Sequence, residues 1–260
     1  MAPGINLRPP AVSASFYPAD ASQLQLNLQH YFSQTKTIKP PAGKKKLKAL
    51  IVPHAGYLYS GLTAAWGFRQ LNLTKTQHFV LLGPSHHACF AGLAAAASKF
   101  WLTPLGKINH APPKKFLNDL PHQSEHCLEV QLPFLQFLYH RRFSFTAFLT
   151  GQLDASKMAR YLLTAYPRSI FLISSDLSHY LPLTVAKTQD QLTIKAILNL
   201  NAQYFNLNDN AACGATAIQI LINLAKTASW QPQSIYYDTS ATASGDHQQV
   251  VGYTSLGFYE

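Results

Sequence analysis

Histidine side chains follow three apolar segments that lie far apart in the sequence. "LIVPHAGY" contains His54, "VLLGPSHH" ends in His86 and His87, and "FLISSDLSHY" contains Asp176 and His179. Neutral imidazole with neighbouring oxygen ligands binds iron(II), copper or zinc. An imidazole can also move protons, because its ordinary pKa lies near neutrality. The pattern predicts a mononuclear metal site, with His54, His86 and His179 as candidate ligands.

The metal-site prediction depends on the occurrence of histidine after three separate apolar segments. A single histidine after a strand is usually an ordinary loop residue, and His54 alone indicates nothing more. In open α/β sheets, however, ligands bind beyond the carboxyl ends of the strands, where such loops meet. Two alternatives stay open. The same cleft could bind a peptide or partner protein without catalysis, or a metal-bound water could hydrolyse a substrate with His179 or Glu125 as its base.

The segment "SEHCLEVQLP" adds Glu125, His126 and Glu129. Two glutamates near the start of a helix are explained by the helix dipole, but His126 is not. We expect this segment beside the site, as support for the metal ligands or as a substrate contact. Glu125 and His126 are therefore catalytic candidates, together with His179 and Asp176.

Two further segments carry groups that could reach the site. Cys213 precedes an apolar helix, where a thiol pKa can be lowered, although we favour the commoner case of a buried, inert thiol. The loop "TSATASGDHQQVVGY" brings Asp246 or His247 to the site, or it is a plain loop between edge strands. The candidate substrate contacts are Tyr57, Ser85, His87 and Asp246.

Strand and helix patterns alternate along nearly the whole chain. Strands with their following loops are predicted at 48–57, 78–87, 143–150, 169–180, 234–240 and 250–260, and 92–98 fits either a strand or a helix. Helices are predicted at 60–71, 112–120, 124–140 and 154–166, with two or three more in 184–228; Ser124 would cap 124–140 and Pro133 kink it. This order predicts one domain, 1–260, built as a three-layer α/β/α sandwich on a central mixed sheet.

Composition narrows the class of protein. The 260 residues are 47% hydrophobic and only 12% charged, about half the usual share, which indicates a compact globular protein and argues against disorder. The net charge of +10 is densest at Lys44–Lys48, which we interpret as a solvated loop. No aromatic residues interleave with these lysines, which argues against nucleic-acid binding as the function. Three cysteines without a C-x-x-C pair, and no signal or membrane segment, indicate a cytoplasmic protein.

Several motifs, in this order, resemble one known family. "PHAGYLYSG", "LLGPSHH", "EHCLEVQLPFL", "SSDLSHY", "ACG" and "SGD…VVGY" are similar to segments of the Memo family, whose prokaryotic members are called AmmeMemoRadiSam system protein B. The opening "RPPAVSASFYPAD" also resembles that family. The likeness extends over essentially the whole chain.

The resemblance implies a fold like that of the protocatechuate-cleaving extradiol dioxygenases, which use a mononuclear non-haem iron. It places His54 and His86 as metal histidines and His179 as an acid/base beside Asp176. Ala243 stands about where animal members carry a cysteine ligand, so His179, Asp176 or water would complete the site.

The resemblance also implies a redox-linked protein with a divalent transition metal, iron or copper most readily and zinc as a further option. The substrate would be an unidentified small molecule or peptide. Radical-SAM and AMMECR-type proteins are the partners that the family name implies.

Overall fold

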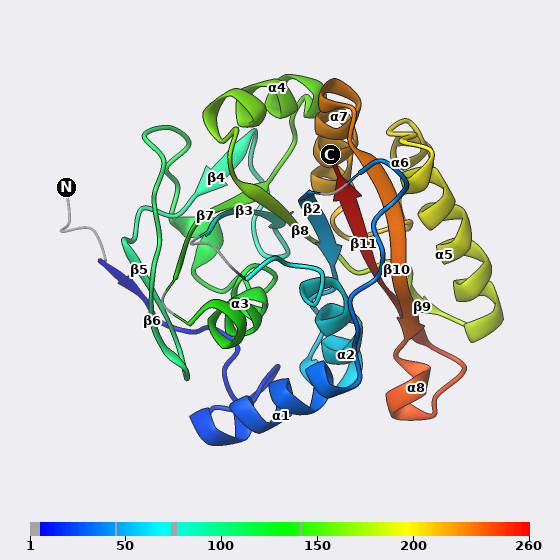
Figure 1. Cartoon of the computed structure of the whole chain (residues 1–260), viewed down its shortest axis with the longest axis horizontal. Coiled ribbons are helices and arrows are strands. Elements are labelled where there is room, and N and C mark those ends of the chain that lie inside the picture. The colour runs from blue at the N-terminus through cyan, green and yellow to red at the C-terminus, as the bar shows by residue number, and fades with distance from the viewer. Residues whose placement is uncertain (1–5, 45, 74–76, 141) are drawn as a thin grey trace.

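An eight-stranded sheet crosses the molecule, and helices cover both of its faces (Figure 1). The computed structural model describes residues 6–44, 46–73, 77–140 and 142–260. Seven strands follow one another in the order β10 (Gln231–Thr239), β11 (Val250–Tyr259), β2 (Leu47–Val52), β8 (Ile170–Ser174), β3 (Gln77–Pro84), β7 (Phe143–Thr150) and β4 (Leu93–Ala95). The eighth, β9 (His179–Leu181), pairs with β11.

The sheet is mixed, as predicted. Its central strands β2, β8, β3 and β7 are parallel, whereas β10, β11, β4 and β9 join it antiparallel. The loops that follow the four parallel strands therefore leave from one edge of the sheet.

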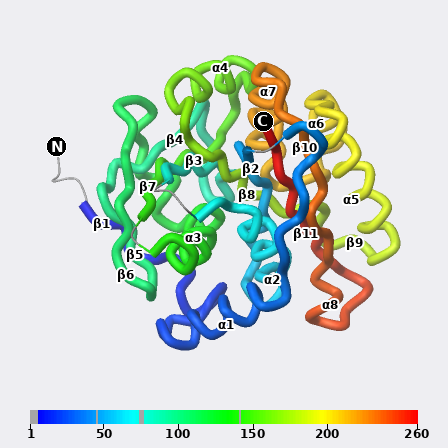
Figure 2. Tube along the Cα trace, viewed as in Figure 1, coloured from blue at the N-terminus to red at the C-terminus, as the bar shows by residue number. Residues whose placement is uncertain are grey.

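Side chains alternate between two buried clusters, one on each face of the sheet. In β2, Leu50 and Val52 pack in the cluster with α1 (Ala21–Ser33), α2 (Tyr57–Phe68) and α3 (Leu132–Tyr139), while Ala49 and Ile51 pack on the opposite side. The opposite side is covered by α4 (Ala155–Ala165), α5 (Leu183–Leu198), α6 (Tyr204–Leu207) and α7 (Ala215–Ala228). The predicted three-layer sandwich is confirmed, and the Cα trace shows the same layering (Figure 2).

A second, three-stranded sheet was not predicted. It consists of β1 (Leu7–Arg8), β5 (Phe100–Thr103) and β6 (Gly106–Asn109). His110 joins it to β7, because its Nδ1 lies 2.5 Å from the carbonyl oxygen of Ser98 and its Nε2 accepts a hydrogen bond from the Ala147 N–H. Burial lowers the pKa of His110 to about 4, so the ring is neutral, as this pair of bonds requires.

One predicted helix is wrong, and another begins later than predicted. Residues 112–120 are mainly irregular, because Phe116 and Asn118 exchange backbone hydrogen bonds with Ala95, and only the short 3-10 helix η1 (Leu120–His122) follows. In 124–140, a turn leads to the 3-10 helix η2 (Glu129–Gln131) and only then to α3. Ser124 therefore caps no helix, and Pro133 lies in the first turn of α3, where proline is tolerated.

Other segments differ in detail. Residues 92–98, which fitted either a strand or a helix, contain strand β4. Residues 169–180, predicted as one strand with its loop, divide into β8 and the start of β9. In the basic run, Lys48 is buried in β2, 3.7 Å from a Glu260 carboxylate oxygen, and Lys45 lies outside the described residues. Within the described chain, no helix combines the length and apolar character needed to cross a bilayer.

Candidate metal centre

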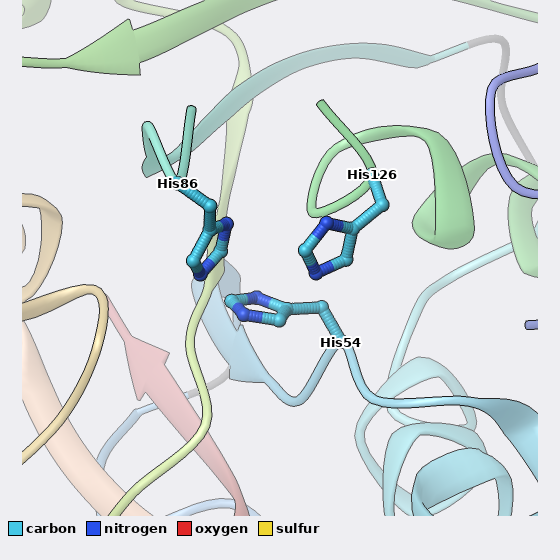
Figure 3. A group of neighbouring side chains, drawn as sticks. All are labelled: His54, His86 and His126. Atoms are coloured by element: carbon cyan, nitrogen blue, oxygen red, sulfur yellow. The ribbon is translucent and has the colours of Figure 1, made fainter. Parts of the chain in front are cut away.

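Three imidazoles meet beyond the carboxyl ends of β2 and β3, which β8 separates in the sheet (Figure 3). His54 follows β2, His86 follows β3, and His126 lies in the turn before η2. One ring nitrogen from each lies within 4.8 Å of the other two. The ring centroids are 5.2, 5.4 and 4.6 Å apart. Metal–nitrogen bonds of about 2 Å to one tetrahedral ion place such centroids roughly 5 Å apart, so the arrangement fits a shared ion.

Glu125 orients two of these imidazoles. Its Oε1 lies 2.9 Å from Nδ1 of His86 and 3.3 Å from Nδ1 of His126, and it also accepts the backbone N–H groups of His126 and Cys127. Burial alone would raise the pKa of the Glu125 carboxyl, but the hydrogen bonds from His86 and Cys127 lower it below the usual range. An ionised carboxylate only accepts, so Nδ1 of His86 carries hydrogen and its Nε2 can bind metal, while Nδ1 of His126 faces the same carboxylate oxygen.

Ser174, the last residue of β8, fixes the third ring in the same way. Its hydroxyl donates to the carbonyl of Cys127 at 2.6 Å, so its oxygen is free to accept from Nδ1 of His54 at 2.9 Å. The Gln131 amide donates to the same oxygen at 2.8 Å. Nδ1 of His54 therefore carries hydrogen, and its Nε2 is also left with a lone pair.

Burial keeps these rings neutral. It lowers the pKa of His54, which is 2% exposed, to about 3, with His86 adding to the effect. It lowers the pKa of His126 to about 4, where the neighbouring His54 contributes. Neutral imidazole is the form that binds metal, so the site needs no deprotonation of these two rings near pH 7.

A thiol and a carboxyl flank His54. Cys213 Sγ lies 3.2 Å from His54 Nε2, so this partly buried thiol lies against the imidazole cluster and could add a fourth donor. Asp176 accepts the His54 backbone N–H at 2.7 Å, and its own N–H donates to Cys213 Sγ. Burial raises the pKa of both the Asp176 carboxyl and the Cys213 thiol, with Asp176 adding to the latter. Ala243, by contrast, is exposed in α8 (Ala241–Ser244).

The other predicted site residues have varied positions. His179 falls outside the group of three imidazoles found among the described residues, and its Nδ1 lies 2.8 Å from the carbonyl of Leu177. His87 is exposed, with its ring centroid 6.5 Å from that of His86 and 6.4 Å from that of His126. The roles predicted for them stay predictions.

The predicted substrate contacts do not share one environment. Tyr57 is 3% exposed, and its hydroxyl donates to the carbonyl of Val130. Ser85 caps its own loop by accepting from the Ala88 N–H. Asp246 is exposed and accepts from the Gln248 N–H. A cavity of about 870 Å³ opens elsewhere, between α1, β6 and α3, and these candidates do not line it.

From the sequence, His126 was predicted to lie beside the metal ligands and not to be one of them. The contacts of Ser174 and Cys213 with His54 were not predicted. The unexplained histidine in "SEHCLEVQLP" was the available signal for the first. The fold and the convergent imidazoles define an α/β protein with a candidate metal centre at the carboxyl ends of its parallel strands.

Comparison with known proteins identifies the family. The sequence profile of the Memo-like protein family matches residues 8–257, and the chain belongs to this family. A MEMO1 family protein of Archaeoglobus fulgidus is 34% identical over 272 residues, which cover 97% of this chain and 99% of the relative. A MEMO1 family protein of Aquifex aeolicus is 32% identical, over 98% of this chain and all of the relative.

Proposed function

We propose that the protein holds one divalent transition-metal ion between His54, His86 and His126 and uses it in redox-linked chemistry on a small molecule or peptide. The observation that carries the proposal is the convergence of three imidazole nitrogens whose opposite ring nitrogens are tied to Glu125 or Ser174. Imidazole donors with a thiol nearby suit iron and copper, and also zinc. The geometry favours His126 over His179 as the third donor.

The residues around the ion have separate tasks. Bound iron or copper would supply electron transfer at an open coordination position. Glu125 and Ser174 orient the ligands, and Asp176 fixes the backbone of His54. His179 remains the proposed acid/base, because its Nδ1 faces a backbone carbonyl and so carries hydrogen, which leaves Nε2 as the proton acceptor. A cytoplasmic setting and partners of the radical-SAM and AMMECR types are further proposals that rest on the sequence alone.

Metal analysis tests the proposal. Untagged protein should carry close to one iron, copper or zinc ion per chain, and His54→Ala, His86→Ala and His126→Ala should each lose most of it. Absence of metal from the wild type, after growth with each metal supplied, would contradict the proposal. The wild type and the His54→Ala variant would then be tested for capture of a peptide or protein partner, with and without chelator. Capture that changes neither with chelator nor with His54→Ala favours a non-catalytic binding module.

A further inference from the structure

A buried ion pair joins the N-terminal segment, residues 8–17, to the turn that carries His126. Nη1 of Arg8 lies 2.6 Å from Oε2 of Glu129, and the two residues are 6% and 0% exposed. Taking two charges out of water is costly unless their remaining hydrogen-bonding groups are also satisfied. The surroundings of both residues meet that condition.

The other donors of Arg8 hold the backbone of the same turn. Its Nε donates to the carbonyl of His122 at 3.0 Å, and its Nη2 donates to the carbonyl of Glu125 at 2.6 Å. The guanidinium lies 4.1 Å from the ring centroid of Trp101. The Arg8 side chain therefore binds the turn at His122, before Glu125, at Glu125 itself, and at Glu129, after it.

Glu129 in turn fixes the path of the N-terminal segment. Its carboxylate accepts the backbone N–H groups of Ala11 and Val12, at 2.7 and 3.1 Å, and the hydroxyl of Tyr17 at 2.6 Å. The residues that donate these three hydrogen bonds come before and after Phe16 in the sequence, so Glu129 restricts where the Phe16 ring can lie.

Phe16 contacts both walls of the metal centre. Its ring centroid is 4.7 Å from that of His126, and its carbonyl accepts the Tyr57 N–H at 2.8 Å, at the start of α2 just after the His54 loop. The segment thus bridges the His54 loop and the His126 turn, although among the described residues neither Arg8 nor Glu129 contacts the three clustered imidazoles.

We propose that Arg8 and Glu129 are positioning residues for the metal centre: by docking residues 8–17 against the turn, they set the orientation of His126 through Phe16 and the Glu125 backbone. The N-terminal segment is then a working part of the site, and metal affinity depends on how it is docked. This inference rests on the proposed function, since it assumes that His126 binds the ion.

Cobalt(II) binding to the full chain tests the inference. Metal-free wild type, Glu129→Gln, Phe16→Leu and Phe16→Tyr would be titrated with Co²⁺ against a competing chelator, and the visible absorption of the bound ion recorded. Glu129→Gln and Phe16→Leu should weaken Co²⁺ binding about tenfold or more, as loss of an outer-shell partner does, and should shift the absorption bands. Phe16→Tyr keeps the ring and should retain wild-type affinity and spectrum.

Lys48→Met is the matched control, because it removes the Lys48–Glu260 contact at 3.7 Å on β2, away from the imidazoles. It should leave the Co²⁺ affinity and spectrum unchanged even if it lowers the unfolding midpoint. Wild-type affinity and spectrum in a folded Phe16→Leu protein would overturn the inference, and this variant carries the test if Glu129→Gln does not fold. A wild type that binds no Co²⁺ would instead refute the proposed function, and the inference with it.

Discussion

The carboxylate shared by two imidazoles makes Glu125→Gln the most informative single change. Oε1 of Glu125 serves the Nδ1 atoms of His86 and His126, and Oε2 accepts the His86 backbone N–H at 2.7 Å. A glutamine oxygen at the Oε1 position would keep the first two contacts. Its amide nitrogen would then oppose the His86 N–H, donor against donor, and the negative charge would be lost.

The size of the effect follows from these contacts. Loss of an outer-shell partner typically weakens metal binding 10- to 100-fold. Since Glu125 supports two candidate ligands at once, we expect the upper end, about 100-fold, which corresponds to about 2.8 kcal/mol. The ion should still bind in a ratio of one per chain, because His54, His86 and His126 all remain.

Competition titration with Zn²⁺ or Co²⁺ at constant pH measures this change, with thermal unfolding followed in parallel. Glu260→Gln is the control: the Glu260 side chain is 55% exposed and its carboxylate lies 3.7 Å from Nζ of Lys48. This change should leave metal affinity unchanged. If Glu125→Gln bound metal as tightly as wild type while folded, the assignment of Glu125 as the support of both ligands would be refuted.

Four further changes test other parts of the structure. His126→Ala should reduce metal content to a few per cent by elemental analysis, whereas His179→Ala should keep close to one ion per chain; the reverse result would restore His179 as the third ligand. Because the pKa of His110 falls from 6.5 to about 4 on folding, the unfolded chain binds the extra proton, and stability declines as pH falls from 6.5 to 4. His110→Gln should reduce that decline by up to about 3 kcal/mol in denaturant titrations, and an unchanged decline would count against a neutral ring. Gly252→Ala would place Cβ 1.8 Å from Oδ2 of Asp190 and should cost about 3 kcal/mol of unfolding free energy; wild-type stability would show that the site relaxes.

Periodicity was sufficient to predict the sheet and two of the metal candidates. The strands before His54 and His86 are buried on both faces, so each appears in the sequence as an uninterrupted apolar run ending at a polar loop. Parallel strands deliver such loops to one edge whatever their order in the sheet. That is why the positions of His54 and His86 could be anticipated without knowing the topology.

The third imidazole could not be anticipated in this way. The turn at Glu125 and His126 has good helical spacing, and its real conformation depends on Arg8, 117 residues from Glu125. Local propensity contains no information about a partner so distant. His179 follows β8, but it lies in β9, which pairs with β11, and its Nδ1 faces the carbonyl of Leu177.

The same long separations bear on when an ion can be acquired. The proposed ligands His54, His86 and His126 follow one another at intervals of 32 and 40 residues (86 − 54 and 126 − 86), and His54 lies 159 residues from Cys213, so an unfolded chain presents no ready-made chelating pair among them. Uptake of the proposed ion would then follow assembly of the sheet, and the ion would act as a crosslink that only the native state offers. Occupancy would stabilise that state by about 2.7 kcal/mol when free metal exceeds the dissociation constant 100-fold. Cells short of metal would therefore accumulate a folded but more easily unfolded apoprotein.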